Sequence, residues 1–303
     1  MALPPRPAPV TQLAPGLRRV LADNPSPMTY WGTNSYIVGT GAVAVVDPGP
    51  ADPAQIAAIL TALEPGETVS HIFVTHAHLD HSPGASLLAA ETGALVLAYG
   101  DAQAGRSAQM AALAAQGGLA GGEGVDAGFA PDQMLADGEV VSHGDWQLEA
   151  LWTPGHFGNH LSFALPEGQG LLCGDLVMGW ASSLVSPPDG DLAAFMASLA
   201  RLAARRDAVY YPGHGEPITA PAARVAELKA HREMRGRQIA EALRDAPGTA
   251  ADLAARIYTD TPAALLPAAA RNVLAHLIEM ASKNEAQHEG ALRADSVFAP
   301  LQE

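Results

Sequence analysis

The eight residues 74–81, with the sequence VTHAHLDH, constrain the fold of this chain more than any other segment. Three histidines and one aspartate, His76, His78, Asp80 and His81, follow directly after an apolar run. Around an α-helix these positions point in different directions, so no helix could present all four side chains on one face. A loop that leaves the end of a buried strand can bring them together. Clustered imidazole and carboxylate groups are typical zinc ligands, so the segment predicts a metal-binding loop, with an unliganded histidine-rich turn as the alternative.

Three further candidate ligands each follow an apolar run and stand next to a glycine. They are His156 in TPGH, Asp175 in CGD and His214 in PGHG. Singly, each has an ordinary explanation, since histidines occur in turns and aspartates cap helices. In a layered α/β fold, however, the loops at the strand ends gather into one site. We therefore expect these three side chains to join the four of the first segment.

Seven candidate ligands exceed the four positions of one tetrahedral zinc ion, so two divalent ions are the economical interpretation. We expect one ion to be held by His76, His78 and His156, the other by Asp80, His81 and His214, and both to be bridged by Asp175 and a water molecule. Such a centre is locally positive and can attract an anionic substrate to an acidic protein.

The charge and composition of the chain disfavour several classes of partner. Its 303 residues include 17 basic and 32 acidic side chains, a formal charge of −15, which argues against general binding to nucleic acids or anionic membranes. The single cysteine, Cys173, excludes an internal disulfide and is expected to be a small buried core residue. No apolar run approaches the ~20 residues of a membrane-spanning helix, and the N-terminal segment lacks the apolar region of a signal peptide. We therefore expect a cytoplasmic protein.

Residues 1–220 alternate short β-type runs with alanine- and leucine-rich helical stretches, which is typical of an α/β fold. The expected strands are 36–39 and 42–47 (a hairpin), 69–75, 94–98, 147–152, 161–165, 171–174 and 208–211. The expected helices are 54–63 and 191–203. Residues 101–137 are rich in alanine and glycine with weak periodicity, and we expect a mobile loop or lid there.

A change of pattern near residue 220 predicts a domain boundary. Residues 1–220 carry 7 basic and 21 acidic side chains, whereas residues 221–303 carry 10 and 11. Beyond the boundary we expect helices at 222–243, 250–257 and 268–280, followed by a weak polar strand or wing beyond 285. The chain is therefore divided into residues 1–220 and a small helical domain, residues 221–303.

The ordered set of motifs, His76-x-His78-x-Asp80-His81 followed by His156, Asp175 and His214, resembles that of the metallo-β-lactamase superfamily, with no member missing. The resemblance covers roughly residues 15–220. It implies an αββα sandwich that is the catalytic domain, with two metal ions, usually zinc, at one edge.

A closer resemblance rests on Thr33-Asn-Ser-Tyr36, on PGHGEPI at 212–218 and on HREMRGRQI at 231–239. These segments are similar to those of the β-lactamase-like protein 2 subgroup. Its members add a C-terminal winged-helix-like domain, and some of them cleave single-stranded RNA.

The expected function is that of a dinuclear zinc-dependent hydrolase. A metal-bridging hydroxide would attack a small ester, thioester or lactone, and Asp80 would serve as the catalytic residue that orients the nucleophile and passes its proton on. The cofactors expected are two divalent ions, Zn²⁺ first, with iron or manganese as alternatives.

Two alternative functions use the same scaffold. One is a single-strand-specific endoribonuclease, which the net charge disfavours. The more remote one is a mononuclear iron persulfide dioxygenase. The expected partner is therefore a small-molecule substrate, anionic substrates included, and a homodimer is left open.

Overall fold

The computed structural model describes residues 5–119 and 124–301. Its first sheet has seven strands in chain order, the first four antiparallel and the rest added in parallel. These strands are β1 (Val10–Ala14), β2 (Leu17–Leu21), β3 (Asn34–Val38), β4 (Ala42–Val46), β5 (Thr68–Phe73), β6 (Leu95–Ala98) and β7 (Gln133–Met134). Helix α1 (Pro53–Thr61) connects β4 to β5, and α2 (Gly84–Thr92) connects β5 to β6. Parallel neighbours require such crossovers.

The second sheet has the strand order β12-β11-β10-β9-β8. Its strands are β8 (Val140–His143), β9 (Trp146–Trp152), β10 (Leu161–Ala164), β11 (Leu171–Gly174) and β12 (Tyr210–Pro212), with a 3₁₀ turn, η1 (Pro166–Gly168), between β10 and β11. Only the β11–β12 pair is parallel, and α4 (Leu192–Ala203) crosses between those two strands.

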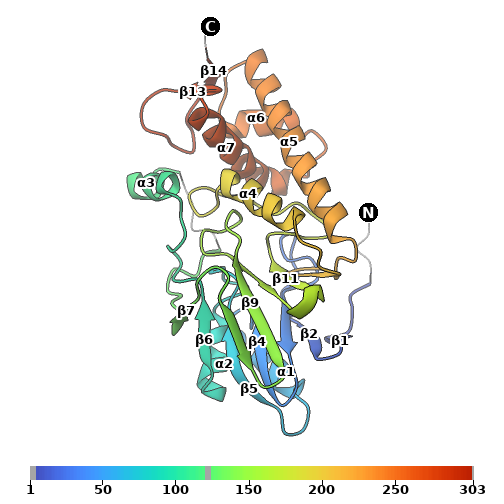
Figure 1. Ribbon diagram of the computed structural model, residues 1–303. Coiled ribbons are helices and arrows are strands. Elements are labelled where there is room, and N and C mark those ends of the chain that lie inside the picture. The colour runs from blue at the N-terminus through green and yellow to red at the C-terminus, as the bar shows by residue number, and fades with distance from the viewer. Residues whose placement is uncertain (1–4, 120–123, 302–303) are drawn as a thin grey trace.

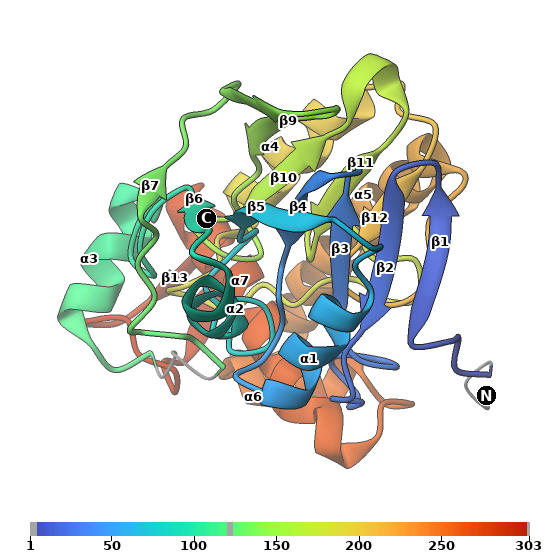
Figure 2. The same ribbon diagram turned by 90° about the horizontal axis from the view of Figure 1, so that it is seen from below.

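The two sheets pack face to face, and helices cover their outer faces. Between the sheets, the Phe73 ring of β5 meets the rings of Phe163 on β10 and Trp146 on β9 edge-on, with ring centroids 5.1 and 5.8 Å apart. Outside the first sheet, Ile59 of α1 and Leu88 of α2 are fully buried in a second apolar cluster. Figure 2 shows α1 and α2 on one side of the sandwich and α4 on the other. The αββα sandwich expected from the resemblance is confirmed.

The C-terminal part is a small helical domain that builds its own core. It contains α5 (Pro221–Asp245), α6 (Ala250–Ile257), the 3₁₀ turn η2 (Ala263–Leu265), α7 (Leu266–Ser282) and the antiparallel pair β13 (Ala286–His288) and β14 (Phe298–Pro300). Phe298, Leu253 and Leu277 are fully buried in this core. The three expected helices and the expected wing are therefore present, and the domain stacks on the α4 end of the sandwich (Figure 1). The boundary near residue 220 stays a prediction, and α5 begins at Pro221.

The expected mobile loop or lid at residues 101–137 is wrong in one respect, because the segment contains regular secondary structure. Helix α3 (Ala108–Gln116) lies within this segment and is capped by the Ser107 hydroxyl, which accepts from the amide of Met110. The segment also supplies β7, and Met110 is buried in the core of the C-terminal domain. Tertiary contact with residues far along the chain stabilises a helix that local periodicity does not reveal. Residues 120–123 lie outside the described residues. No helix among those described is both long and apolar enough to cross a bilayer.

A buried arginine fastens the C-terminal domain to the sandwich. Arg232 of α5 is 3% exposed and donates to the backbone carbonyl of Ser183 and to Asn272 Oδ1 of α7, the latter over 2.9 Å. The same Asn272 oxygen accepts from the amide of Val185 over 3.0 Å. Burial lowers the pKa of Arg232 to about 10, so the guanidinium still carries its charge at neutral pH. The loop that contains Ser183 is thus held by two helices of the other domain.

We predict that Arg232→Ala lowers the free energy of unfolding by about 2–3 kcal/mol, because it removes charge-assisted bonds and leaves the Ser183 carbonyl without its donor. Urea denaturation followed by circular dichroism measures the loss. Arg237→Ala is the matched control, since Arg237 lies on the same helix and is exposed, and it should change stability by less than about 0.5 kcal/mol. Equal urea midpoints for the two variants would contradict the role given to Arg232.

Candidate metal centre

The loop between β5 and α2 carries four of the seven expected ligands. It leaves the sheet after Phe73 and reaches α2 at Gly84, so it lies at the carboxyl end of a central strand. A Cβ atom at Gly84 would stand 2.8 Å from the carbonyl oxygen of Gly49, so only glycine allows this approach. The loop is thereby pressed against the turn that follows β4.

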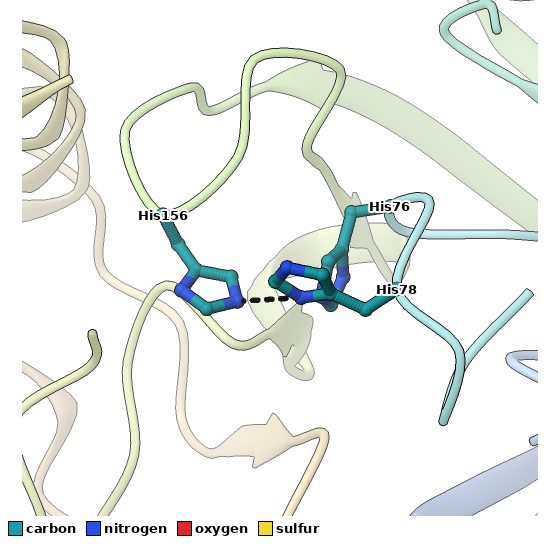
Figure 3. A group of neighbouring side chains, drawn as sticks. All are labelled: His76, His78 and His156. Atoms are coloured by element: carbon teal, nitrogen blue, oxygen red, sulfur yellow. Dashed lines mark hydrogen bonds between the residues drawn. The ribbon is translucent and has the colours of Figure 1, made fainter. Parts of the chain in front are cut away.

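His76, His78 and His156 form the first group of converging side chains (Figure 3). His78 Nδ1 lies 2.8 Å from His76 Nε2 and 3.1 Å from His156 Nε2. Ligand atoms 2.0–2.1 Å from a tetrahedral zinc ion stand about 3.3 Å apart. The three nitrogens are therefore spaced as ligands of one metal ion.

Asp80, His81 and His214 form the second group. His214 Nε2 lies 3.2 Å from both Asp80 Oδ2 and His81 Nε2, and the last two atoms are 3.6 Å apart. The side chain of Asp80 is 28% exposed, whereas the side chains of His81 and His214 are buried. This group has the same ligand spacing as the first, with one side open to solvent.

Asp175 lies between the two groups. Its Oδ2 is 3.7 Å from His156 Nε2 and 3.3 Å from His214 Nε2, while its Oδ1 is 3.6 Å from His81 Nε2. Oδ1 is buried and has no hydrogen-bond partner among the described residues, which is costly for a carboxylate unless a cation binds it. A Cβ at Gly213 would collide with this oxygen at 2.3 Å, so glycine leaves the space that the carboxylate occupies. The orphaned oxygen and the donor set both fit divalent metal ions.

The outer ring nitrogens are fixed by neighbours that orient the imidazoles. His156 Nδ1 donates to the carbonyl of Leu184 over 2.6 Å, and His214 Nδ1 donates to that of Gly32 over 3.1 Å. His81 Nδ1 lies 2.9 Å from Asp47 Oδ2. These contacts hold a proton on Nδ1 and turn Nε2, the nitrogen that would bind a metal ion, toward the centre.

Asp47 and His160 support the site without being candidate ligands, and of the two only Asp47 was not anticipated from the sequence. Asp47 follows β4 with a φ of 51°, accepts from the amide and hydroxyl of Thr75 and contacts His81. A carboxylate at the end of a buried strand, directly before Pro-Gly, was the available signal. His160 Nε2 accepts from the amide of Asp175 over 3.1 Å, so it holds the backbone of the central carboxylate.

The electrostatics of the two groups differ. Burial lowers the pKa values of His76, His78 and His156, that of His78 to about 3, so the first group is neutral and offers free lone pairs. In the second group, burial opposes the charged form of His214, but Asp175 and Asp80 outweigh it and raise its pKa to about 9. A metal ion that binds there takes the place of a proton shared between rings and carboxylates.

The remaining five histidines lie elsewhere. His71 is on β5, His143 on β8, His231 on α5, His276 on α7 and His288 on β13, so none of them joins the site. Cys173 is fully buried, as expected, and burial raises the pKa of its thiol. All seven expected ligands, in contrast, meet at one edge of the sandwich, next to a cavity of about 400 Å³.

Comparison with known proteins agrees with this geometry. The family model "Metallo-beta-lactamase superfamily" matches residues 28–214, and "Beta-lactamase associated winged helix domain" matches residues 249–294. Lactamase-like protein vrtG of Penicillium aethiopicum is 32% identical over 271 residues, which cover 86% of this chain and 79% of that protein. Beta-lactamase-like protein 2 homolog of Caenorhabditis elegans is 30% identical over 269 residues, covering 88% and 84%.

Two further comparisons concern activity and fold. Atrochrysone carboxyl ACP thioesterase dmxR1 of Cryptosporiopsis sp. (strain 8999) is 31% identical over 236 residues, which cover 77% of this chain and 65% of that protein. The crystal structure of a metallo-beta-lactamase family protein from Thermus thermophilus superposes with a TM-score of 0.77 at 27% identity, covering 96% of this chain and 100% of that chain. The resemblance inferred from the motifs is thus confirmed, and the chain belongs to the metallo-beta-lactamase superfamily, as a metal-dependent hydrolase with a C-terminal winged-helix domain.

Proposed function

We propose that this chain is a dinuclear zinc-dependent hydrolase of small acyl esters, thioesters or lactones. The observation that carries the proposal is the pair of three-ligand groups placed on either side of the Asp175 carboxylate. One ion would be held by His76, His78 and His156, and the other by Asp80, His81 and His214. When bound, two divalent ions supply the acidification of a water molecule and the polarisation of the attacked carbonyl oxygen.

The protein's own residues would arrange and protect this chemistry. Asp175 would face both ions. His160 would hold the backbone of Asp175 in place, and Asp47 would orient the ring of His81. Asp80 is partly open to solvent, so its carboxylate is suited to accept a proton from the attacking water and release it outward.

Charge and size favour a small substrate over RNA. The chain has a formal charge of −15, and no lysine or arginine among the described residues lines the cavity beside the site. A polyanion would find no cations to neutralise its phosphates there. The relative named as an ACP thioesterase also supports acyl transfer to water. The second group of ligands argues against a mononuclear iron dioxygenase.

We predict that the purified protein binds close to two divalent ions per chain. Seven converging side chains are more than the four coordination positions of one tetrahedral ion can use, but they are enough for two ions. Plasma emission spectrometry of the protein as purified identifies the metal retained from expression, and the same measurement after dialysis against zinc gives the stoichiometry. A single ion per chain at saturating zinc would contradict the dinuclear proposal.

Asp175→Ala should lose the ion held by Asp80, His81 and His214 first, because that group loses its bridging charge. Hydrolysis should fall by at least a hundredfold while the circular dichroism spectrum is retained. Asp207→Ala is the control: Asp207 is a buried carboxylate that pairs with Arg205 outside the site, and its removal should leave the metal content unchanged. Two retained ions with near-normal turnover in Asp175→Ala would show that Asp175 is no bridge.

Asp47→Asn should lower the affinity for the second ion, the one that His81 would bind, by about 10- to 100-fold. This is the usual effect of losing a hydrogen-bond partner of a ligating histidine. Asparagine keeps the shape and tolerates the left-handed backbone at this position, but it lacks the charge that supports His81. Competition with a zinc-selective dye measures both affinities. The first ion should be unaffected, and an equal weakening of both ions would point to general loosening of the fold.

A further inference from the structure

The cavity beside the metal centre lies between the two domains. Its floor is formed by His78, Asp80, His156, Asp175 and His214. Its opposite wall comes from the C-terminal domain, at the end of α6 and the start of α7, through Tyr258, Leu265, Ala268 and Ala269. Substrate bound at the centre would therefore contact the C-terminal domain directly.

The wall of this cavity is mostly apolar. Met178, Trp180 and Leu184 line the side contributed by the sandwich. Asn272, a polar lining residue, already accepts from Arg232 and from the amide of Val185, so its oxygen is engaged. Besides the candidate ligands, no charged side chain among the described residues lines the cavity. Pockets of this type bind apolar groups and use few polar contacts to orient them.

The cavity lining reaches solvent at Met28 and also at Gly124. Met28 is 47% exposed, so the cavity meets solvent there, near the partly exposed Asp80. Its volume of about 400 Å³ lies toward the lower end of the range for drug-sized ligands. The space suits one chain or ring rather than a polymer, with the rest of the substrate leaving past Met28.

We propose that this cavity binds an uncharged apolar acyl group and that Leu265 and Ala268 of the C-terminal domain determine which acyl groups fit. The inference rests on the proposed hydrolase function. The acyl carbonyl would lie over the metal centre, the acyl group would fill the interdomain cavity, and the thiol or alcohol portion would extend toward Met28. Hydrolysis breaks the acyl carbon–sulfur or carbon–oxygen bond, adds the oxygen of water to the acyl carbon and returns a proton to the leaving group.

The first test compares acyl thioesters of N-acetylcysteamine with the zinc-loaded protein. Each methylene removed from water contributes about three- to fourfold. We therefore expect kcat/KM to rise at least tenfold from acetyl to octanoyl. The succinyl thioester, which carries a negative charge at its far end, should be at least tenfold poorer than the butyryl thioester of similar length.

The second test changes the wall contributed by the C-terminal domain. Ala268→Phe fills the cavity and should lower kcat/KM for the octanoyl thioester at least tenfold while leaving the acetyl thioester within twofold. Leu265→Ala should also lower kcat/KM for the octanoyl thioester more than that for the acetyl thioester. Ala263→Phe is the control, because Ala263 is exposed on the neighbouring turn and does not line the cavity. Metal content and circular dichroism show whether a variant folds. If Ala268→Phe fails to fold, the test rests on Leu265→Ala.

Binding provides a readout that is independent of turnover. Octanoate should change the tryptophan fluorescence of the zinc-loaded protein, through Trp180, at concentrations at least tenfold lower than succinate. Ala268→Phe should raise the Kd for octanoate at least tenfold, whereas Ala263→Phe should not.

The outcomes separate the two proposals. If no ester, thioester or lactone is hydrolysed but octanoate binds as expected, the proposed function is wrong and the pocket assignment stands. If thioesters are hydrolysed with no dependence on chain length, or if succinyl is preferred, the hydrolase function stands and the pocket assignment is overturned. Cleavage of single-stranded RNA without thioester hydrolysis or octanoate binding would overturn both.

Discussion

Five imidazoles and two carboxylates, most of them buried, meet at one edge of the sandwich, and much of the local structure follows from the need to keep them there. The Asp175 carboxylate is the centre of this cluster, because one of its oxygens faces His156 and His214 and the other faces His81. Buried charge is costly without a counterion, and the Asp175 oxygen that lacks a hydrogen-bond partner is the atom that a bound cation would satisfy. The close approach of Gly213 and the bond from the Asp175 amide to His160 serve this arrangement.

The same centre is tied to the C-terminal domain through one short loop. The Ser183 hydroxyl donates to the carbonyl of Asp175, and the carbonyl of Leu184 accepts from His156. Arg232 and Asn272, both from the C-terminal domain, hold the backbone of Ser183 and Val185 on either side. Displacement of this domain would therefore disturb two candidate ligands, as well as one wall of the cavity. The winged-helix domain is part of the site's architecture rather than an appended module.

Local patterns in the sequence predicted an α/β fold and the convergence of the seven residues, whereas the αββα sandwich was implied by the resemblance to the superfamily. Apolar runs that end in glycine and a polar side chain mark strand ends, and strand ends meet at one edge of a layered fold. Helix α3 could not be predicted, because its stability comes from Met110 packing against residues beyond 239 and not from its own periodicity. Strand β2 was missed because Arg18 and Arg19 interrupt its apolar pattern, although both are buried and pair with Glu67 and Glu216. Strand β1 was missed because none of its residues is fully buried, so its sequence carries no apolar run. Asp47 was missed because its partner His81 lies 34 positions away.

The distribution of charge around the cavity also explains how an acidic chain could serve as an acyl hydrolase. A chain with a formal charge of −15 repels polyanions at long range, but that repulsion is screened within about 10 Å at ordinary ionic strength. At the centre itself, two divalent ions would exceed the charge of Asp80 and Asp175, so the local field would favour the electron-rich carbonyl of a substrate. The negative charge of the chain does not repel an uncharged acyl group, which can then pack against the apolar wall of the cavity. A phosphate backbone is repelled by that charge, and no lysine or arginine among the described lining residues would compensate for the repulsion. The cavity would thus have a polar floor at the metal centre and an apolar wall between the domains. This arrangement favours substrates that carry one reactive carbonyl at the end of a hydrophobic group.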